Sequence, residues 1–148
     1  MTAPLAEMNT SAVDREQRTF EALPASARAS RQFVTDTLRT HGADPQLIRD
    51  FVLVVSELAT NIIEHGDGSS LVIYVDVEDK QWWEVEVVGG AATTPAQLLE
   101  PDSWIVASAD DASGRGLGIV HHLMDDISTG SNAGQVSIRC RRRRTEAQ

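Results

Sequence analysis

The sequence has little that could cross-link or anchor a chain. Cys140 is the only cysteine among 148 residues, so an intramolecular disulfide is impossible and a disulfide-built secreted scaffold is excluded. No run approaches the roughly 18 apolar residues of a membrane span, and residues 1–14 contain no apolar segment typical of a secretory signal. We therefore expect a soluble protein in a reducing cytoplasm.

Positive charge is scarce as well. There are 13 Lys and Arg residues against 22 Asp and Glu residues, which gives a formal net charge of -9. Nucleic acid and anionic membranes repel such a chain at long range, so protein or small-molecule partners are favoured. The exception is a basic run comprising Arg139 and Arg141 to Arg144. It could dock an acidic partner or nucleic acid, although a solvated tail is the commoner meaning of such a run.

The length predicts one domain that buries a sizeable core without covalent support. Residues 1–16 lack hydrophobic periodicity and indicate a flexible leader. Residues 17–141 should form the folded domain, and residues 142–148 should form a basic C-terminal tail.

Two helices are predicted in the first half of the chain. Ser26 is a candidate N-cap for a helix over residues 27–41, which Gly42 would end. Asp44 and Pro45 form a stronger start signal, after which apolar residues at steps of four and three predict a helix of about 21 residues, ending at Gly66. The stripe consists of Leu47, Phe51, Val55, Leu58 and Ile62.

Alternating residues predict strands. They indicate a short strand over residues 19–23, an antiparallel hairpin over 71–78 and 82–87 with one buried face, and a last strand over 136–140. Residues 89–113 lose this periodicity and form a segment long enough for a lid, in which residues 95–99 could form a short helix. Ile119, Leu123 and Ile127 predict a helix of about three turns, followed by a turn over residues 130–134.

Glu57 and Asn61 lie one helical turn apart, on a face rotated by about 100° from the apolar stripe. A carboxylate there can accept a proton from an attacking hydroxyl group. An amide oxygen one turn later can ligate Mg²⁺, which prefers oxygen ligands. The same pair would also suit a polar helix edge without a chemical role.

Three glycines at alternate positions, Gly114, Gly116 and Gly118, precede the next helix signal. Glycine permits a positive φ and a close approach of backbone N–H groups to a ligand, and a helix start adds a positive dipole end. Phosphate is the expected ligand, with Arg115 as a neighbouring cation. A tight turn at the start of a helix would have the same composition.

These two fragments resemble the motifs of a known family. Residues 56–65 read Ser-Glu-Leu-Ala-Thr-Asn-Ile-Ile-Glu-His and look like the N-box of the GHKL (Bergerat-fold) ATPases. Residues 114–119 read Gly-Arg-Gly-Leu-Gly-Ile and look like the second glycine box. Within that superfamily the chain is most similar to anti-sigma-factor serine/threonine protein kinases, over roughly residues 18–141. The resemblance implies an α/β two-layer sandwich whose mixed, mostly antiparallel sheet is covered on one face by about three helices.

The resemblance also implies roles. Glu57 would be the catalytic general base, Asn61 would hold Mg²⁺, and ATP would be bound by Asn61, Gly114, Arg115, Gly116, Leu117 and Gly118. Such a cytoplasmic kinase phosphorylates a serine of an anti-anti-sigma protein and sequesters a sigma factor, which regulates transcription in a stress response. A homodimer is also implied.

One residue of the family pattern is absent. The second hairpin strand normally leads into an Asp-x-Gly-x-Gly box whose aspartate accepts from the adenine amino group, but residues 87–95 read Val-Val-Gly-Gly-Ala-Ala-Thr-Thr-Pro. Loss of one charge-assisted hydrogen bond costs roughly 1.5–3 kcal/mol, or about one to two decades of affinity. Two alternatives therefore stay open: a non-catalytic anti-sigma module that only binds partners, and an ATP-hydrolysing subunit of a larger assembly.

Overall fold

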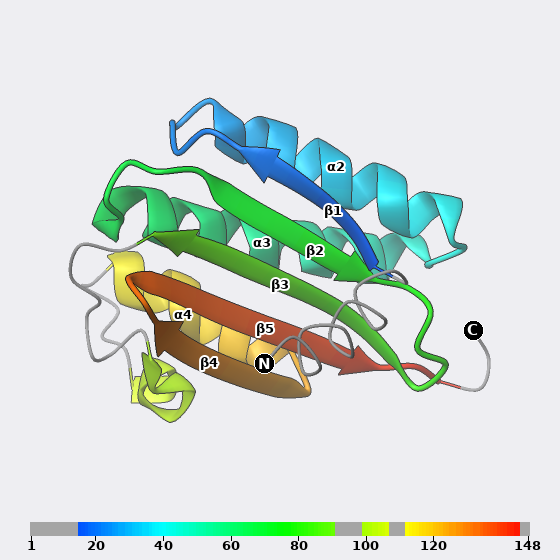
Figure 1. The fold of residues 1–148 in the computed structure, drawn as a ribbon. Coiled ribbons are helices and arrows are strands. Elements are labelled where there is room, and N and C mark those ends of the chain that lie inside the picture. The colour runs from blue at the N-terminus through cyan, green and yellow to red at the C-terminus, as the bar shows by residue number, and fades with distance from the viewer. Residues whose placement is uncertain (1–14, 91–98, 107–111, 146–148) are drawn as a thin grey trace, which may run out of the picture.

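The computed structural model describes residues 15–90, 99–106 and 112–145. Five strands form one antiparallel sheet in the order β1-β2-β3-β5-β4, and Figure 1 shows α2, α3 and α4 on one face of it. The bounds of the elements are β1 (Arg15–Phe20), α2 (Ser26–Thr40), α3 (Pro45–His65), β2 (Leu71–Asp76), β3 (Trp82–Gly90), the 3-10 helix η2 (Pro101–Val106), α4 (Ala112–Leu123), β4 (Asp126–Asn132) and β5 (Gln135–Arg143).

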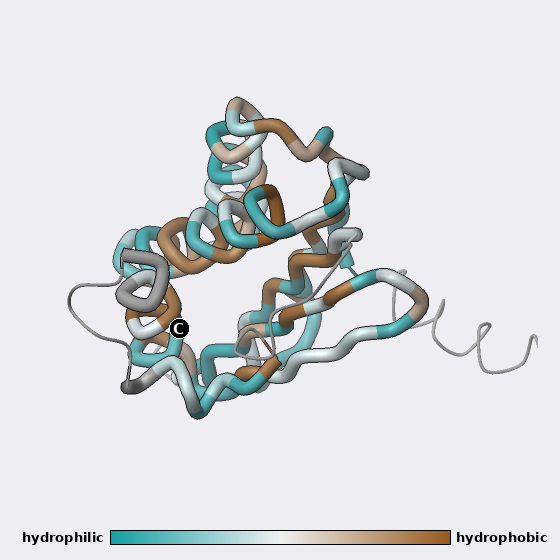
Figure 2. Tube along the Cα trace, turned by 90° about the vertical axis from the view of Figure 1, so that its left-hand side faces the viewer, coloured by the Kyte–Doolittle hydropathy of each residue, from teal (hydrophilic) through white to brown (hydrophobic). Residues whose placement is uncertain are grey.

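The predicted two-layer α/β sandwich is confirmed, and Figure 2 shows the helices and the sheet as separate layers. Within the described residues all strand pairings are antiparallel, rather than mixed. Among the described helices, none is both long and apolar enough to cross a membrane.

The long helix α3 forms as predicted. The side chain of Asp44 accepts hydrogen bonds from the backbone N–H groups of Gln46 and Leu47, and Pro45 occupies the first helical position, where its missing N–H costs nothing. The helix has 21 residues and ends at Gly66. Every member of the predicted apolar stripe is buried in the core.

The sheet supplies the other half of the core. Alternate residues of β2 and β3 face the helices, and the buried ones include Leu71, Ile73, Val75, Trp83, Val85 and Val87. The predicted hairpin is therefore confirmed, because each strand has one face against the helices, although β3 extends to Gly90.

The N-terminal boundaries differ from the prediction. Strand β1 begins at Arg15, inside the predicted leader, because backbone pairing with β2 holds an edge strand that is mostly exposed and so lacks a hydrophobic pattern. Ser26 is the first residue of α2 rather than its N-cap. Its N–H group donates to the carbonyl of Leu23 at 2.8 Å, so a preceding turn replaces a side-chain cap.

The end of the chain also differs. Ile127 belongs to β4 rather than to α4, Ile119 is 41% exposed, and the predicted turn is shortened to Ala133 and Gly134, whose φ values are 53° and 79°. The buried face of α4 consists instead of Leu117 and Val120, and Met124, the residue after the helix, is buried with them.

The basic run is not a solvated tail. Arg142 donates to the Asp50 carboxylate at 2.9 Å, and the guanidinium group of Arg141 lies 4.3 Å from the ring centre of Trp82. Arg144 donates to a backbone carbonyl of β3 and one just beyond β2. These contacts hold the end of β5 in place. The strand extends to Arg143, two residues beyond the predicted domain boundary at residue 141.

Candidate functional site

Helix α3 presents Glu57 and Asn61 at the edge of the core. Glu57 is half-buried, and Asn61 is only 6% exposed. The Nδ2 atom of Asn61 donates to the backbone carbonyl of Glu57 at 2.8 Å. Because a carbonyl only accepts, this bond fixes the amide orientation and turns Oδ1 away from the helix backbone. Within the described residues no hydrogen bond to Oδ1 is found, which makes this oxygen a candidate ligand for a cation.

The carboxylate of Glu57 lies directly against Gly116 of α4. A Cβ atom added at Gly116 would overlap Oε1 of Glu57 and lie 2.7 Å from its Cδ atom. Two residues 59 positions apart in the sequence are therefore in contact, and any larger residue at position 116 would force the Glu57 carboxylate to move. The structure places the predicted carboxylate and the predicted glycine cluster side by side.

The glycine cluster itself differs from the expected loop. Helix α4 begins at Ala112, so Gly114, Gly116 and Gly118 all lie within it, and the glycines of positive φ among the described residues are Gly42, Gly68 and Gly134. Two glycines of α4 are explained by close packing: Gly116 meets Glu57, and an added Cβ at Gly118 would lie 3.2 Å from the carbonyl oxygen of Trp104.

Because the glycines lie within α4, the residues of this helix expected to bind ATP fall into two groups: those of the first helical turn and those farther along the helix. The N–H groups without partners inside a helix are those of its first turn, here residues 112–115, which include Gly114 and Arg115. Leu117 is only 4% exposed and packs in the core, so its contribution is structural. The side chain of Arg115 lies outside the described part of the structure.

The end of β3, where the family aspartate is missing, is filled by other side chains. A Cβ atom added at Gly89 would overlap Cγ2 of Ile62, the residue after Asn61. The next glycine, Gly90, lies against the Asp67 carboxylate and the Ser69 hydroxyl. The sequence alone did not predict either contact, since each joins β3 to a residue of α3 or of the loop after it, more than twenty positions away.

Asp67 is held in its ionised form. Hydrogen bonds from the side chain and the backbone N–H of Ser69 lower the pKa of its carboxyl group. Because successive side-chain positions of a strand point to opposite faces, and Gly89 faces Ile62 of α3, Gly90 and Asp67 lie on the other side of the strand. Asp67 therefore brings a carboxylate to the end of β3, but not to the face of Gly89.

The residues present are chemically suited to the metal and phosphates of a magnesium nucleotide, but not to its base. The described residues contain no group of three or more His, Cys, Asp or Glu side chains that could hold a metal by themselves. Magnesium commonly uses one or two protein oxygens together with phosphate oxygens and waters, which the amide oxygen of Asn61 suits. The phosphate half of the site that the resemblance implies is thus chemically suitable, whereas its base half lacks the expected aspartate, since Gly89 lies against Ile62.

Comparisons with known proteins agree with this architecture. The family described as histidine kinase-like ATPase domain matches residues 20–141. The solved structure of the RsbU and RsbW domains of Rv1364c from Mycobacterium tuberculosis is similar, with 19% identity and a TM-score of 0.62. That match covers 87% of this chain and 31% of the other, so this chain spans less than a third of it. No curated protein matches the sequence.

Two further structures are similar over nearly their whole length. The SiaB-SiaC complex from Pseudomonas aeruginosa has 13% identity and a TM-score of 0.64, with 95% of this chain and 97% of that chain covered. The catalytic domain of the histidine kinase ThkA has 18% identity and a TM-score of 0.50, with 86% and 95% covered. At these identities the likeness shows a shared fold.

Proposed function

This chain belongs to the histidine kinase-like ATPase domain family, and from that premise we propose that it is an anti-sigma serine/threonine kinase. It binds Mg-ATP, phosphorylates a serine of an anti-anti-sigma protein and sequesters a sigma factor, acting as a homodimer. The contact between Glu57 and Gly116 carries the proposal, because it brings a carboxylate to the helix whose first turn can bind phosphate. The fold shared with an RsbW domain, and with SiaB, which was crystallised with SiaC, supports a protein partner.

The chain's own residues have distinct tasks in this proposal. Glu57 accepts the proton of the attacking serine hydroxyl, and the oxygen of Asn61 holds the metal. The N–H groups of the first turn of α4 orient the phosphates. Bound Mg²⁺ neutralises charge on the phosphate oxygens, and positioning together with electrostatics supplies most of the acceleration in phosphoryl transfer.

The test combines calorimetric titration with nucleotide and transfer of labelled γ-phosphate to purified anti-anti-sigma proteins of the same organism. We expect Mg²⁺-dependent binding and transfer. Glu57→Gln should lower transfer by about 10²- to 10⁴-fold while sparing most of the binding, because a general base is lost but the metal ligand is not. Glu64→Gln is the matched control, since Glu64 is an exposed glutamate on the same helix. Absence of both Mg²⁺-dependent binding and transfer would overturn the proposal.

A second function is favoured by the contact between Ile62 and Gly89. With an aliphatic side chain there and no aspartate, the domain could act as a non-catalytic anti-sigma module. Partner binding that is indifferent to ATP and to Asn61→Ala would establish this function.

A further inference from the structure

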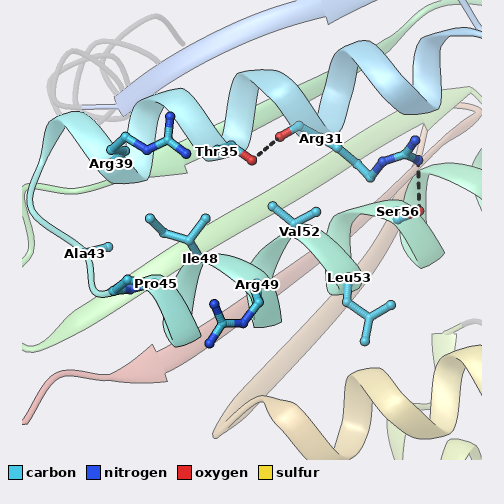
Figure 3. A pocket seen from close by; sticks show the side chains of 10 residues that line it. All are labelled: Arg31, Thr35, Arg39, Ala43, Pro45, Ile48, Arg49, Val52, Leu53 and Ser56. Carbon is cyan, nitrogen blue, oxygen red and sulfur yellow. Dashed lines mark hydrogen bonds between the residues drawn. The ribbon is translucent and has the colours of Figure 1, made fainter.

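The outer face of the helix layer carries a groove that the proposed catalytic site does not use. It lies between α2 and α3 and has a volume of about 520 Å³. Figure 3 shows Ile48 and Val52 pointing from α3 toward α2, whereas Leu53 projects from the other flank of α3. Leu53 is 40% exposed, which is high for a leucine on a helix that faces a core. The floor of the groove, formed by Ile48 and Val52, is therefore apolar, and Leu53 adds an exposed apolar side chain at its edge.

Three arginines border this apolar floor. Arg31 and Arg39 belong to α2, Arg49 belongs to α3, and none of the described residues that line the groove carries a carboxylate. Arg49 donates to the side chain of Gln46 at 2.8 Å, and Arg31 makes a long contact of 3.4 Å with the hydroxyl of Ser56.

None of these three arginines forms an ion pair within the described part of the chain, whereas four other arginines do. The chain as a whole has a formal net charge of -9, so this cationic rim differs in sign from the average of the molecule. The chain thus repels acidic molecules at long range but offers them a local cationic surface at this groove.

We propose that the groove binds an acidic amphipathic helix of a protein partner. Apolar side chains of that helix fill the floor, and its carboxylates pair with the guanidinium groups, which favour carboxylates in bidentate geometry. Arg31 and Arg39 are eight residues apart on one helix, which corresponds to about 12 Å at 1.5 Å per residue. The partner helix should therefore carry acidic residues about two turns apart, with apolar residues one turn apart between them.

This inference rests on the proposed function for the premise that the partner is a protein, but the groove is separate from the nucleotide residues. Glu57 and Asn61 do not line it. Binding at the groove can therefore be measured in the absence of nucleotide, and in an Asn61→Ala chain. Peptide binding that survives in that variant would separate failure of the kinase proposal from failure of this one.

The probe is a displayed library of constrained 15-residue helical peptides, randomised on one face and selected on the full chain. Selected peptides should combine carboxylates with apolar residues at the stated spacing. In fluorescence anisotropy, the double variant Arg31→Glu/Arg39→Glu should raise the dissociation constant at least tenfold. Arg28→Glu is the matched control, because Arg28 is exposed on the same helix outside the groove, and it should change binding less than twofold.

High salt should weaken binding of the selected peptides, since exposed charges are screened. Circular dichroism verifies folding of each variant, and Arg39→Gln replaces the double variant if that one does not fold. The inference is overturned if selection enriches neutral or basic peptides, if nothing is enriched over the charge-reversed chain, or if the selected peptides bind the charge-reversed and parent chains equally.

Discussion

Replacing Gly116 with alanine tests the central contact of the candidate site. Alanine in the interior of a helix is more favourable than glycine by about 1 kcal/mol. The new methyl group, however, would overlap the carboxylate of Glu57, so that side chain must rotate away, at a cost of about 0.5–1.5 kcal/mol if it leaves its rotamer well. The two effects nearly cancel, and the free energy of unfolding should change by less than about 1 kcal/mol, or about 2–4 °C in Tm.

A double-mutant cycle isolates the cause. In a Glu57→Ala background the obstruction is gone, so Gly116→Ala should stabilise the protein by the full helix-propensity gain of about 1 kcal/mol. In the parent background it should stabilise less, which gives a coupling energy of about 0.5–1.5 kcal/mol in urea unfolding. Phosphoryl transfer by Gly116→Ala should fall by about 10²-fold or more, because the displaced carboxylate no longer reaches the acceptor hydroxyl.

Gly118→Ala is the matched control on the same helix. Its added Cβ would approach the carbonyl oxygen of Trp104 at 3.2 Å and does not meet Glu57, so its effect should be the same in both backgrounds. The reasoning would be refuted if the unfolding free energies of Gly116→Ala and Glu57→Ala were simply additive. Full phosphoryl transfer by Gly116→Ala would refute the assigned position of the base.

Three other substitutions probe separate features. Asn61→Ala should lower nucleotide affinity in the presence of Mg²⁺ by at least about tenfold and leave the affinity in EDTA nearly unchanged, as measured by calorimetry, because the amide oxygen is the candidate metal ligand. Equal losses in both buffers would contradict that role. Arg142→Met should destabilise the protein by about 2–3 kcal/mol in urea unfolding, because it leaves the buried carboxylate of Asp50 without its cation. Adding Asp50→Leu should restore most of this loss, and a single variant as stable as the parent would contradict the assignment. Glu84→Gln should raise Tm at pH 7, because burial raises the folded-state pKa of this carboxyl group above its ordinary value of 4.5, so the folded state loses stability as pH rises through that range. The gain should vanish below about pH 4, where Glu84 is protonated in both the folded and the unfolded state. Glu78→Gln, at an exposed position, should show no such pH dependence.

Local signals were enough to predict the scaffold of the site. The capping carboxylate of Asp44, the proline after it and the apolar stripe of α3 act within one helix, so their meaning does not depend on the rest of the fold. The same holds for the hairpin, whose alternation reports a single buried face. Because α3 is continuous, the positions of Glu57 and Asn61 on its edge followed directly from their spacing.

The segments that sequence patterns misassigned are held by distant partners. Trp104 lies in a stretch without periodicity, yet it is fully buried beneath α4, because one large side chain can fill a gap without any repeating pattern. Strand β4 has few apolar residues and exists because β5 pairs with it along its whole length. The arginines at the end of β5 appear as a charged tail until Asp50 and Trp82 are brought beside them.

The glycines show most clearly why composition is ambiguous at a site. A glycine can provide a positive φ or allow another group to approach closely, and the sequence does not distinguish these two uses. At Gly116 the structure shows the second use, with Glu57 as the neighbouring group, and at Gly89 it shows the same use with Ile62. Both neighbours belong to the last three turns of α3. The two side chains leave α3 on different faces, the Glu57 carboxylate against α4 and Ile62 against the end of β3. In the proposed site we therefore expect nucleotide affinity to come mainly from the phosphates and their metal.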